Sequence, residues 1–382
     1  MPLSPPDSTS ARTLPMLASL DGLRALAVLL VIPHNAHLPA PADSLVTRLL
    51  EQWLDRGWIG VQLFFVLSGF LITRILMRTQ SASNYFSGFY IRRALRIWPL
   101  YYATLVVLLW VMPRLGWVAN HDQSHDLYLW TFTSNWVHGH ALSGARVPHF
   151  WSLAVEEQFY LVWPLLLYRA GTKRVLLTSA LVAVSALIIR HSLLSQGWDP
   201  EAVYTATLAR MDALAWGAAG AALMELACVR QWLNQHRLSA WAVPLGLLLI
   251  GAAVSGGYKQ LGWLPQTAGY TLLASAFAAL VMCAAAGDQG WIVRCMAWSR
   301  MAVMRRIGQY SFGMYVFHAP LSTLVLLPLA KHWGWLQAPT LLMQLAYIGL
   351  CMLGSMVLAA LSYHGFEQHF LSLKARWAPV RQ

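Results

Sequence analysis

Charged residues are scarce in this chain of 382 residues. Asp, Glu, Lys and Arg make up 11% of the sequence, whereas soluble domains contain about 25%. Hydrophobic residues account for 58%, and the mean hydropathy is +0.50. This composition argues against a soluble domain and predicts a polytopic membrane protein. A net charge of +12 would suggest nucleic-acid binding in a soluble protein. Here arginines in loops beside a membrane explain the charge, so we expect no nucleic-acid partner.

Cysteine is also rare. The four cysteines do not show the spacing of a metal-binding motif, and none has a partner for a disulfide in an expected outer loop. We therefore expect no disulfide and no bound metal. The long connection 114–149 contains histidines that could ligate a metal, although loop histidines usually do not. These are His121, His125, His138 and His140. Phosphate-binding and dinucleotide-binding motifs are absent as well.

Ten apolar segments are long enough to cross a hydrocarbon core of about 30 Å. They lie near residues 18–38, 58–77, 95–113, 150–169, 174–195, 205–228, 238–256, 264–286, 303–330 and 340–371. The sequence therefore predicts an all-α polytopic membrane protein with about ten transmembrane helices in one membrane domain, 18–373. We expect a loose cytoplasmic tail at 1–17, where Pro and Ser are frequent, and a basic cytoplasmic tail at 374–382.

The distribution of Lys and Arg predicts how the chain is oriented in the membrane. If the N-terminus is cytoplasmic, the inner connections carry 18 of these residues and the outer side seven, with Arg190 counted on the outer side. Cytoplasmic loops carry the excess of positive charge in membrane proteins. Both termini are therefore expected in the cytoplasm, and Arg24 and Arg210 fall inside spans.

One span contains two adjacent carboxylates, in the stretch WSLAVEEQFYLVWPLLL that begins at Trp151. Adjacent residues point about 100° apart on a helix, so Glu156 and Glu157 cannot act as a pair on one face. Ser152 and Glu156 do share a face, at i and i+4. Ionisable groups inside a membrane are functional by default, which favours a role for Glu156. Glu157 could instead bridge helices structurally.

Two arginines, Arg93 and Arg96, share a helix face in the stretch YIRRALRIWP. They could be ordinary anchors at the cytoplasmic surface. They could also bind a diphosphate, since guanidinium groups bind phosphate bidentately. His34 lies near the outer end of the span that begins DGLRALAVLL, and a lone histidine there could equally be a packing residue.

Several stretches, taken in order, resemble the integral-membrane acyltransferase-3 family. They are DGLRALAVLLVIPHNAH, GVQLFFVLSGFLIT, FYIRRALRIWPLYY, HFWSLAVEEQFYLVWPLL, RMDALAWGAAGA, IGQYSFGMYVFHAP and SYHGFEQHFLSLK. The resemblance covers roughly residues 18–373. It implies about ten core helices and the transfer of an acyl group, commonly acetyl from acetyl-CoA, to a hydroxyl of a carbohydrate.

The resemblance also implies site residues. The motif residues of the family correspond to Arg24 and His34 in the first span, to the pair Arg93 and Arg96, and to Glu156. The resemblance draws attention in addition to His149, Ser152, Arg210, Tyr315 and His318. One position departs from the pattern, because the family places its histidine eleven residues after the arginine, where this chain has Asn35. On a regular helix the one-residue shift rotates the imidazole of His34 by about 100°.

We therefore expect an acetyl-CoA-dependent O-acetyltransferase in the bacterial cytoplasmic (inner) membrane, acting on a cell-envelope carbohydrate such as O-antigen of lipopolysaccharide, exopolysaccharide or a glycolipid. In this hypothesis Arg93 and Arg96 hold the diphosphate of the donor and the pantetheine arm passes Arg24. His34 takes the proton of the acceptor hydroxyl, and Glu156 orients the imidazole or holds the sugar. Acyl-CoA would be a substrate, with no bound cofactor. The alternative is a transporter or flippase for a glycolipid, but duplicated halves, which are common in transporters, are not evident.

Overall fold

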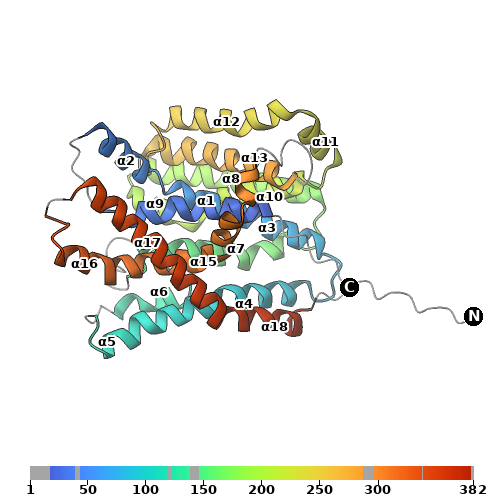
Figure 1. Cartoon of the computed structure of the whole chain (residues 1–382). Helices are drawn as coiled ribbons and strands as arrows, with labels where there is room; N and C mark the ends of the chain where they lie inside the picture. The colour runs from blue at the N-terminus through green and yellow to red at the C-terminus, as the bar shows by residue number, and fades with distance from the viewer. Residues whose placement is uncertain are drawn as a thin grey trace, which may run out of the picture.

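The structure, a computed structural model, describes residues 18–38, 44–118, 123–137, 146–286, 296–337 and 339–379. Within these residues the regular elements are helices, and no strand occurs (Figure 1). The expected all-α class is confirmed. His121, His138 and His140 lie outside the described residues, as does the expected tail 1–17.

Each of the ten expected segments contains a long helix. These helices are α1 (Ala18–Asn35), α3 (Ile59–Arg78), α4 (Tyr85–Val106), α7 (Trp151–Leu167), α8 (Thr172–Ser195), α10 (Thr207–Leu223), α12 (Arg237–Val254), α13 (Tyr270–Ala286), α15 (Ala302–Leu321) and α17 (Leu341–Ser362). The shorter helices are α2 (Leu45–Asp55), α5 (Met112–Arg114), α6 (Asp126–Trp130), α9 (Pro200–Thr205), α11 (Ala227–Gln235), α16 (Leu327–His332) and α18 (Gln368–Trp377).

Short π-helical stretches join several of these helices into longer rods. They are Val107–Val111, Pro265–Gly269, Ser322–Leu326 and Tyr363–Glu367. Among the described residues, six helical rods are long and apolar enough to cross a membrane, and a seventh qualifies if α9–α10 and α11, which meet at a 91° bend, form one span. The protein is therefore a multi-pass membrane protein. The count of ten spans and the orientation of the termini stay predictions.

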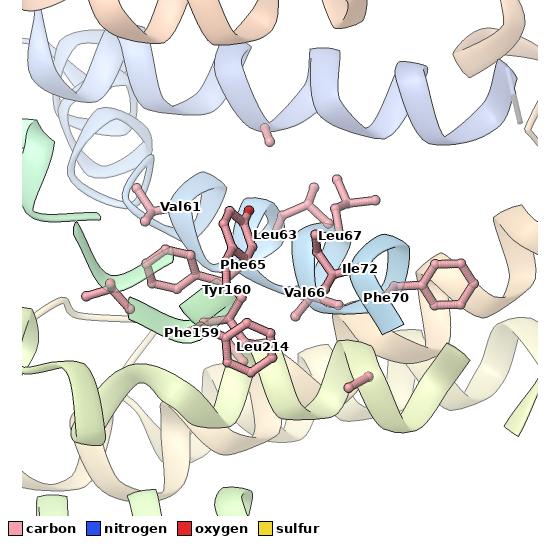
Figure 2. Packing of buried hydrophobic residues seen from close by; sticks show 14 of the residues in the cluster. Val61, Leu63, Phe65, Val66, Leu67, Phe70, Ile72, Phe159, Tyr160 and Leu214 are labelled. Atoms are coloured by element: carbon pink, nitrogen blue, oxygen red, sulfur yellow. The ribbon is translucent and has the colours of Figure 1, made fainter. Parts of the chain in front are cut away.

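The helices α1, α3 and α10 form the centre of the bundle. Figure 1 shows α12 on one side of this centre and α4 with α18 on the other. The core side chains of α3 pack around Leu214 of α10 and Phe159 of α7 (Figure 2). Close approach of α3 and α10 depends on Gly69 and Gly217, because a Cβ at Gly69 would overlap the carbonyl of Leu214 and one at Gly217 that of Val66. Small residues at such crossings are typical of membrane helices.

A buried ion pair connects α8 to α10. Arg190 donates to the carboxylate of Asp212 at 2.8 Å, and both side chains are fully buried. Arg190 also donates to the hydroxyl of Thr271, at 2.8 Å, and to the carbonyl of Ala209. Arg190 thus lies inside the bundle near one end of α8, and its place on the outer side stays a prediction. A compensating carboxylate and further acceptors offset the cost of placing this charge inside the bundle.

We expect Gly69→Val to lower the free energy of unfolding by about 3 kcal/mol, because the added side chain forces α3 away from α10. Gly246→Val in α12 is the matched control, since a Cβ there would meet no atom within 4 Å. Thermal unfolding of the purified protein, followed by tryptophan fluorescence, checks the difference. Equal midpoints for the two variants would contradict this account of the packing.

Candidate active site

A cavity of about 110 Å³ lies between α1, α3, α4, α7 and α15. Its charged lining residues are Arg24, Arg93, Arg96 and Glu156, and its hydroxyl-bearing ones are Ser68, Ser152, Tyr160, Ser311 and Tyr315. The structure thus brings together, around one cavity, residues that are up to 291 positions apart in the chain (Arg24 and Tyr315). Arg93 and Arg96 do share a face of α4, and Ser152 and Glu156 share a face of α7.

Positive charge dominates one part of the cavity wall. Arg24 donates from Nη1 to Asp21 at 3.0 Å, so its charge is partly balanced. Among the described residues, neither Arg93 nor Arg96 has a hydrogen bond or an ion pair. The guanidinium carbon of Arg93 lies 5.6 Å from the ring centroid of Tyr160, within the range of a cation–π contact. Two guanidinium groups are therefore free to bind an anion.

Glu156 is held in place by the phenol of Tyr160. The Tyr160 hydroxyl donates to Glu156 Oε2 at 2.8 Å and also shares a hydrogen bond with the hydroxyl of Ser68 on α3. Figure 2 shows Tyr160 among the core side chains of α3. The sequence prediction did not include Tyr160 or Ser68. The i, i+4 spacing of Glu156 and Tyr160 was a signal that could have found the tyrosine.

The next carboxylate, Glu157, points away from this cavity, as expected from the helix period. Its Oε2 accepts a hydrogen bond from the indole nitrogen of Trp98 on α4 at 3.0 Å. Glu157 therefore bridges α7 to α4 through a tryptophan.

A second polar cluster adjoins the cavity at Ser152 and Tyr315. The two hydroxyl oxygens are 2.5 Å apart and share a hydrogen bond. The carbonyl oxygen of His149 lies 3.1 Å from the Ser152 hydroxyl and 3.0 Å from that of Tyr315, and accepts from the hydroxyl that does not donate to the other. The rings of His149 and His318 are buried, with centroids 4.6 Å apart. His318 Nδ1 is 2.6 Å from the carbonyl oxygen of Tyr315. The structure thus groups four of the residues that the resemblance had singled out.

Two predicted site residues lie elsewhere. His34 is not among the lining residues of the cavity, and its Nδ1 is 2.8 Å from the carbonyl oxygen of Leu54. The helix α1 continues through Pro33 without a break. Arg210 is fully buried beneath aromatic rings, with its guanidinium carbon 4.6 Å from the centroid of Tyr270 and 4.8 Å from that of Tyr204.

Metal ligands do not gather in the part of the chain that the structure describes. No group of three or more His, Cys, Asp or Glu side chains is placed there to hold an ion. The cavity therefore offers guanidinium, carboxylate and hydroxyl groups for chemistry. This set suits the binding of an anionic substrate and proton transfer at a hydroxyl.

A family model described as an acyltransferase domain matches residues 17–360, which is most of the chain. The protein belongs to the integral-membrane acyltransferase-3 family. No solved structure matches the chain.

Named relatives are O-acetyltransferases. The chain is 29% identical, over 329 residues, to the peptidoglycan O-acetyltransferase OatA of Listeria monocytogenes, covering 80% of this chain and 49% of OatA. It is 28% identical over 385 residues to YrhL of Bacillus subtilis, named as a candidate peptidoglycan O-acetyltransferase, covering 92% of this chain and 54% of YrhL. The chain thus spans about half the length of these curated relatives.

Tyr160→Phe should lower the acyl-transfer rate about tenfold while the protein still folds, because Glu156 loses a hydrogen bond to a charged group, worth about 1.5–3 kcal/mol. Tyr168→Phe is the control, since this tyrosine caps the end of α7 and does not lie in the cavity wall. Initial rates with a labelled acyl donor in isolated membranes measure the effect. Unchanged activity in the Tyr160 variant would remove this hydroxyl from the site.

Proposed function

We propose that this protein is an O-acetyltransferase that moves an acetyl group from acetyl-CoA to a hydroxyl of a cell-envelope carbohydrate, in the bacterial cytoplasmic membrane. The observation that supports this most directly is the cavity in which two unpartnered guanidinium groups, Arg93 and Arg96, lie near the carboxylate of Glu156. The names of the relatives support O-acetyl transfer to a cell-envelope polymer. The orientation expected from the charge distribution gives the donor access from the cytoplasm.

The donor is expected to bind through its phosphates. Arg93 and Arg96 would each form bidentate hydrogen bonds to the diphosphate of coenzyme A, which a lysine could not reproduce. The cavity of about 110 Å³ is smaller than the roughly 300–1,000 Å³ of typical small-molecule sites. It therefore suits the acyl end of the pantetheine arm, with the nucleotide remaining outside and Arg24 beside the arm.

The transfer step balances without a further reagent. The oxygen of the acceptor hydroxyl attacks the thioester carbonyl carbon, a C–O bond forms, the C–S bond breaks, and the thiolate leaves. His34 receives the hydroxyl proton at Nε2 and passes it to the thiolate, which restores the neutral imidazole. This role suits the tautomer in which Nδ1–H donates to the Leu54 carbonyl, because Nε2 then carries the free lone pair.

In this scheme the carboxylate of Glu156 binds the acceptor. Its Oε2 accepts from Tyr160, and a carboxylate oxygen has lone pairs enough to accept a further hydrogen bond from a sugar hydroxyl. Because His34 does not line the cavity, the acceptor would have to extend beyond the Ser152–Tyr315 pair to contact both groups. A positioned general base contributes about 10²–10⁴-fold in rate.

His34→Ala should therefore lower the rate of acetyl transfer at least about a hundredfold, with normal insertion into the membrane. The control is His37→Ala. His37 follows the end of α1, and its Nδ1 also lies near a carbonyl oxygen, that of Pro33, at a distance of 3.0 Å. The measurement is transfer of radiolabelled acetyl from acetyl-CoA to the carbohydrate fraction of isolated membranes. If the His34 variant keeps full activity, the proton goes elsewhere, and Glu156→Gln becomes the variant to test.

A further inference from the structure

The short helix α18 packs against α4, the helix that carries the two cavity arginines (Figure 1). Two side chains hold the residues that follow α18 in place. Arg92 donates to the carbonyl of Ala378, at 2.8 and 2.6 Å, and Asn84 donates to the carbonyl of Pro379 at 2.7 Å. Because the two side chains act on neighbouring residues, removing one of them leaves α18 held by the other.

The direction of α18 brings Lys374 opposite Arg96. The residue before α18, Glu367, interacts electrostatically with Arg96, whereas the residue after it, Ala378, contacts Arg92. The two helices are therefore antiparallel. Four residues further along α4 from this contact is Arg96, and four residues back along α18 is Lys374. Residues four apart share a helix face, so the two cations lie on facing sides, one helical turn from the contact.

Lys374 thus adds a third cation to the pair of arginines in the cavity wall. Its ammonium group interacts electrostatically with the guanidinium groups of Arg96 and Arg93. Lys374 is half-buried, and it has no hydrogen bond or ion pair within the described part of the chain. Like charges side by side repel one another, which costs free energy unless an anion binds between them.

The carboxylates around these three cations already accept hydrogen bonds from neutral side chains. They are Glu156, Glu157 and Glu367, which accept from Tyr160, Trp98 and Ser362 respectively. Among the described residues, none of the three forms an ion pair with the cations. The N–H donors of the two arginines and of the lysine therefore remain for a bound anion.

The proposed donor has one phosphate group more than the two arginines account for. In the proposed scheme Arg93 and Arg96 bind the diphosphate of coenzyme A. Its 3′-phosphate is a separate monoester, with a charge of about −1.5 to −2 at pH 7. The ribose links this phosphate to the diphosphate, so the group that binds it must lie next to the two arginines. An ammonium group binds phosphate as a point charge.

We propose that Lys374 binds the 3′-phosphate of the acyl-CoA donor, so that α18 forms one wall of the donor site outside the cavity. This inference rests on the proposed function and adds to it a residue that selects the nucleotide of the donor. A donor that lacks the 3′-phosphate would leave the charge of Lys374 without a partner beside two other cations.

The test is the equilibrium binding of acetyl-CoA and of 3′-dephospho-acetyl-CoA to the full chain, in nanodiscs of phosphatidylcholine, a lipid without net charge. The unmodified protein should bind acetyl-CoA about tenfold more tightly, because a charge-assisted hydrogen bond depends on the 3′-phosphate. Lys374→Met should raise the Kd for acetyl-CoA about tenfold, since this bond is lost, and leave the Kd for the dephosphorylated compound unchanged. Lys374→Arg should keep most of the preference.

Arg376→Met is the matched control. It removes the same charge from the same helix, but Arg376 is exposed and points about 200° away from Lys374 around the helix axis. Both of its Kd values should equal those of the unmodified protein. If Lys374→Met instead weakens the binding of both compounds equally, the lysine has a structural role and the proposal is overturned.

The same measurements distinguish this proposal from the proposed function. Equal affinity of the unmodified protein for the two compounds, or an unchanged preference in Lys374→Met, would contradict the role of Lys374 and leave the donor assignment standing. If the unmodified protein binds neither compound, the donor assignment is contradicted and the role of Lys374 falls with it.

Discussion

Two positive charges without protein partners, on Arg93 and Arg96, determine how the rest of the site must be arranged. A charge placed among apolar helices is costly unless an opposite charge or hydrogen bonds compensate it. Elsewhere this chain provides that compensation within the fold, as Asp212 does for Arg190 and Asp21 does for Arg24. On α4, Arg93 has a cation–π contact with Tyr160 and Arg96 is exposed, and neither has a hydrogen bond or an ion pair among the described residues. This arrangement supports the proposed binding of an anionic donor at the site.

The close packing of the central helices explains why these groups meet at a cavity. Gly69 and Gly217 let α3 approach α10 closely, and α3 in turn carries Ser68 to the hydroxyl of Tyr160. Tyr160 belongs at once to the hydrophobic core and to the site, since its ring packs in the core while its hydroxyl donates to Glu156. Displacing α3 would therefore disturb the carboxylate as well as the core.

Much of the fold could be predicted from the sequence, because apolar length and the period of 3.6 residues act within one helix. The ten segments each became a long helix, and the shared faces of Arg93 with Arg96 and of Ser152 with Glu156 follow from spacing alone. The partners on other helices could not be predicted in this way.

The same limit explains the residues whose placement differed from expectation. The buried partner of Arg190, Asp212, could not be predicted, because the pairing depends on how α8 meets α10. The imidazole of His34 lies by the Leu54 carbonyl and not in the cavity wall, a contact between α1 and α2 that the spacing within α1 could not reveal.

Equilibrium binding of acetyl-CoA to the purified protein tests the central claim most directly. Arg93→Ala and Arg96→Ala should each raise the Kd at least about tenfold, which corresponds to roughly 1.4 kcal/mol. Arg92→Ala should leave the Kd unchanged, because Arg92 donates to the carbonyl of Ala378, at 2.8 and 2.6 Å, and does not line the cavity. Equal affinities in all three variants, or no binding by the unmodified protein, would contradict the assignment of this cavity to an anionic acyl donor.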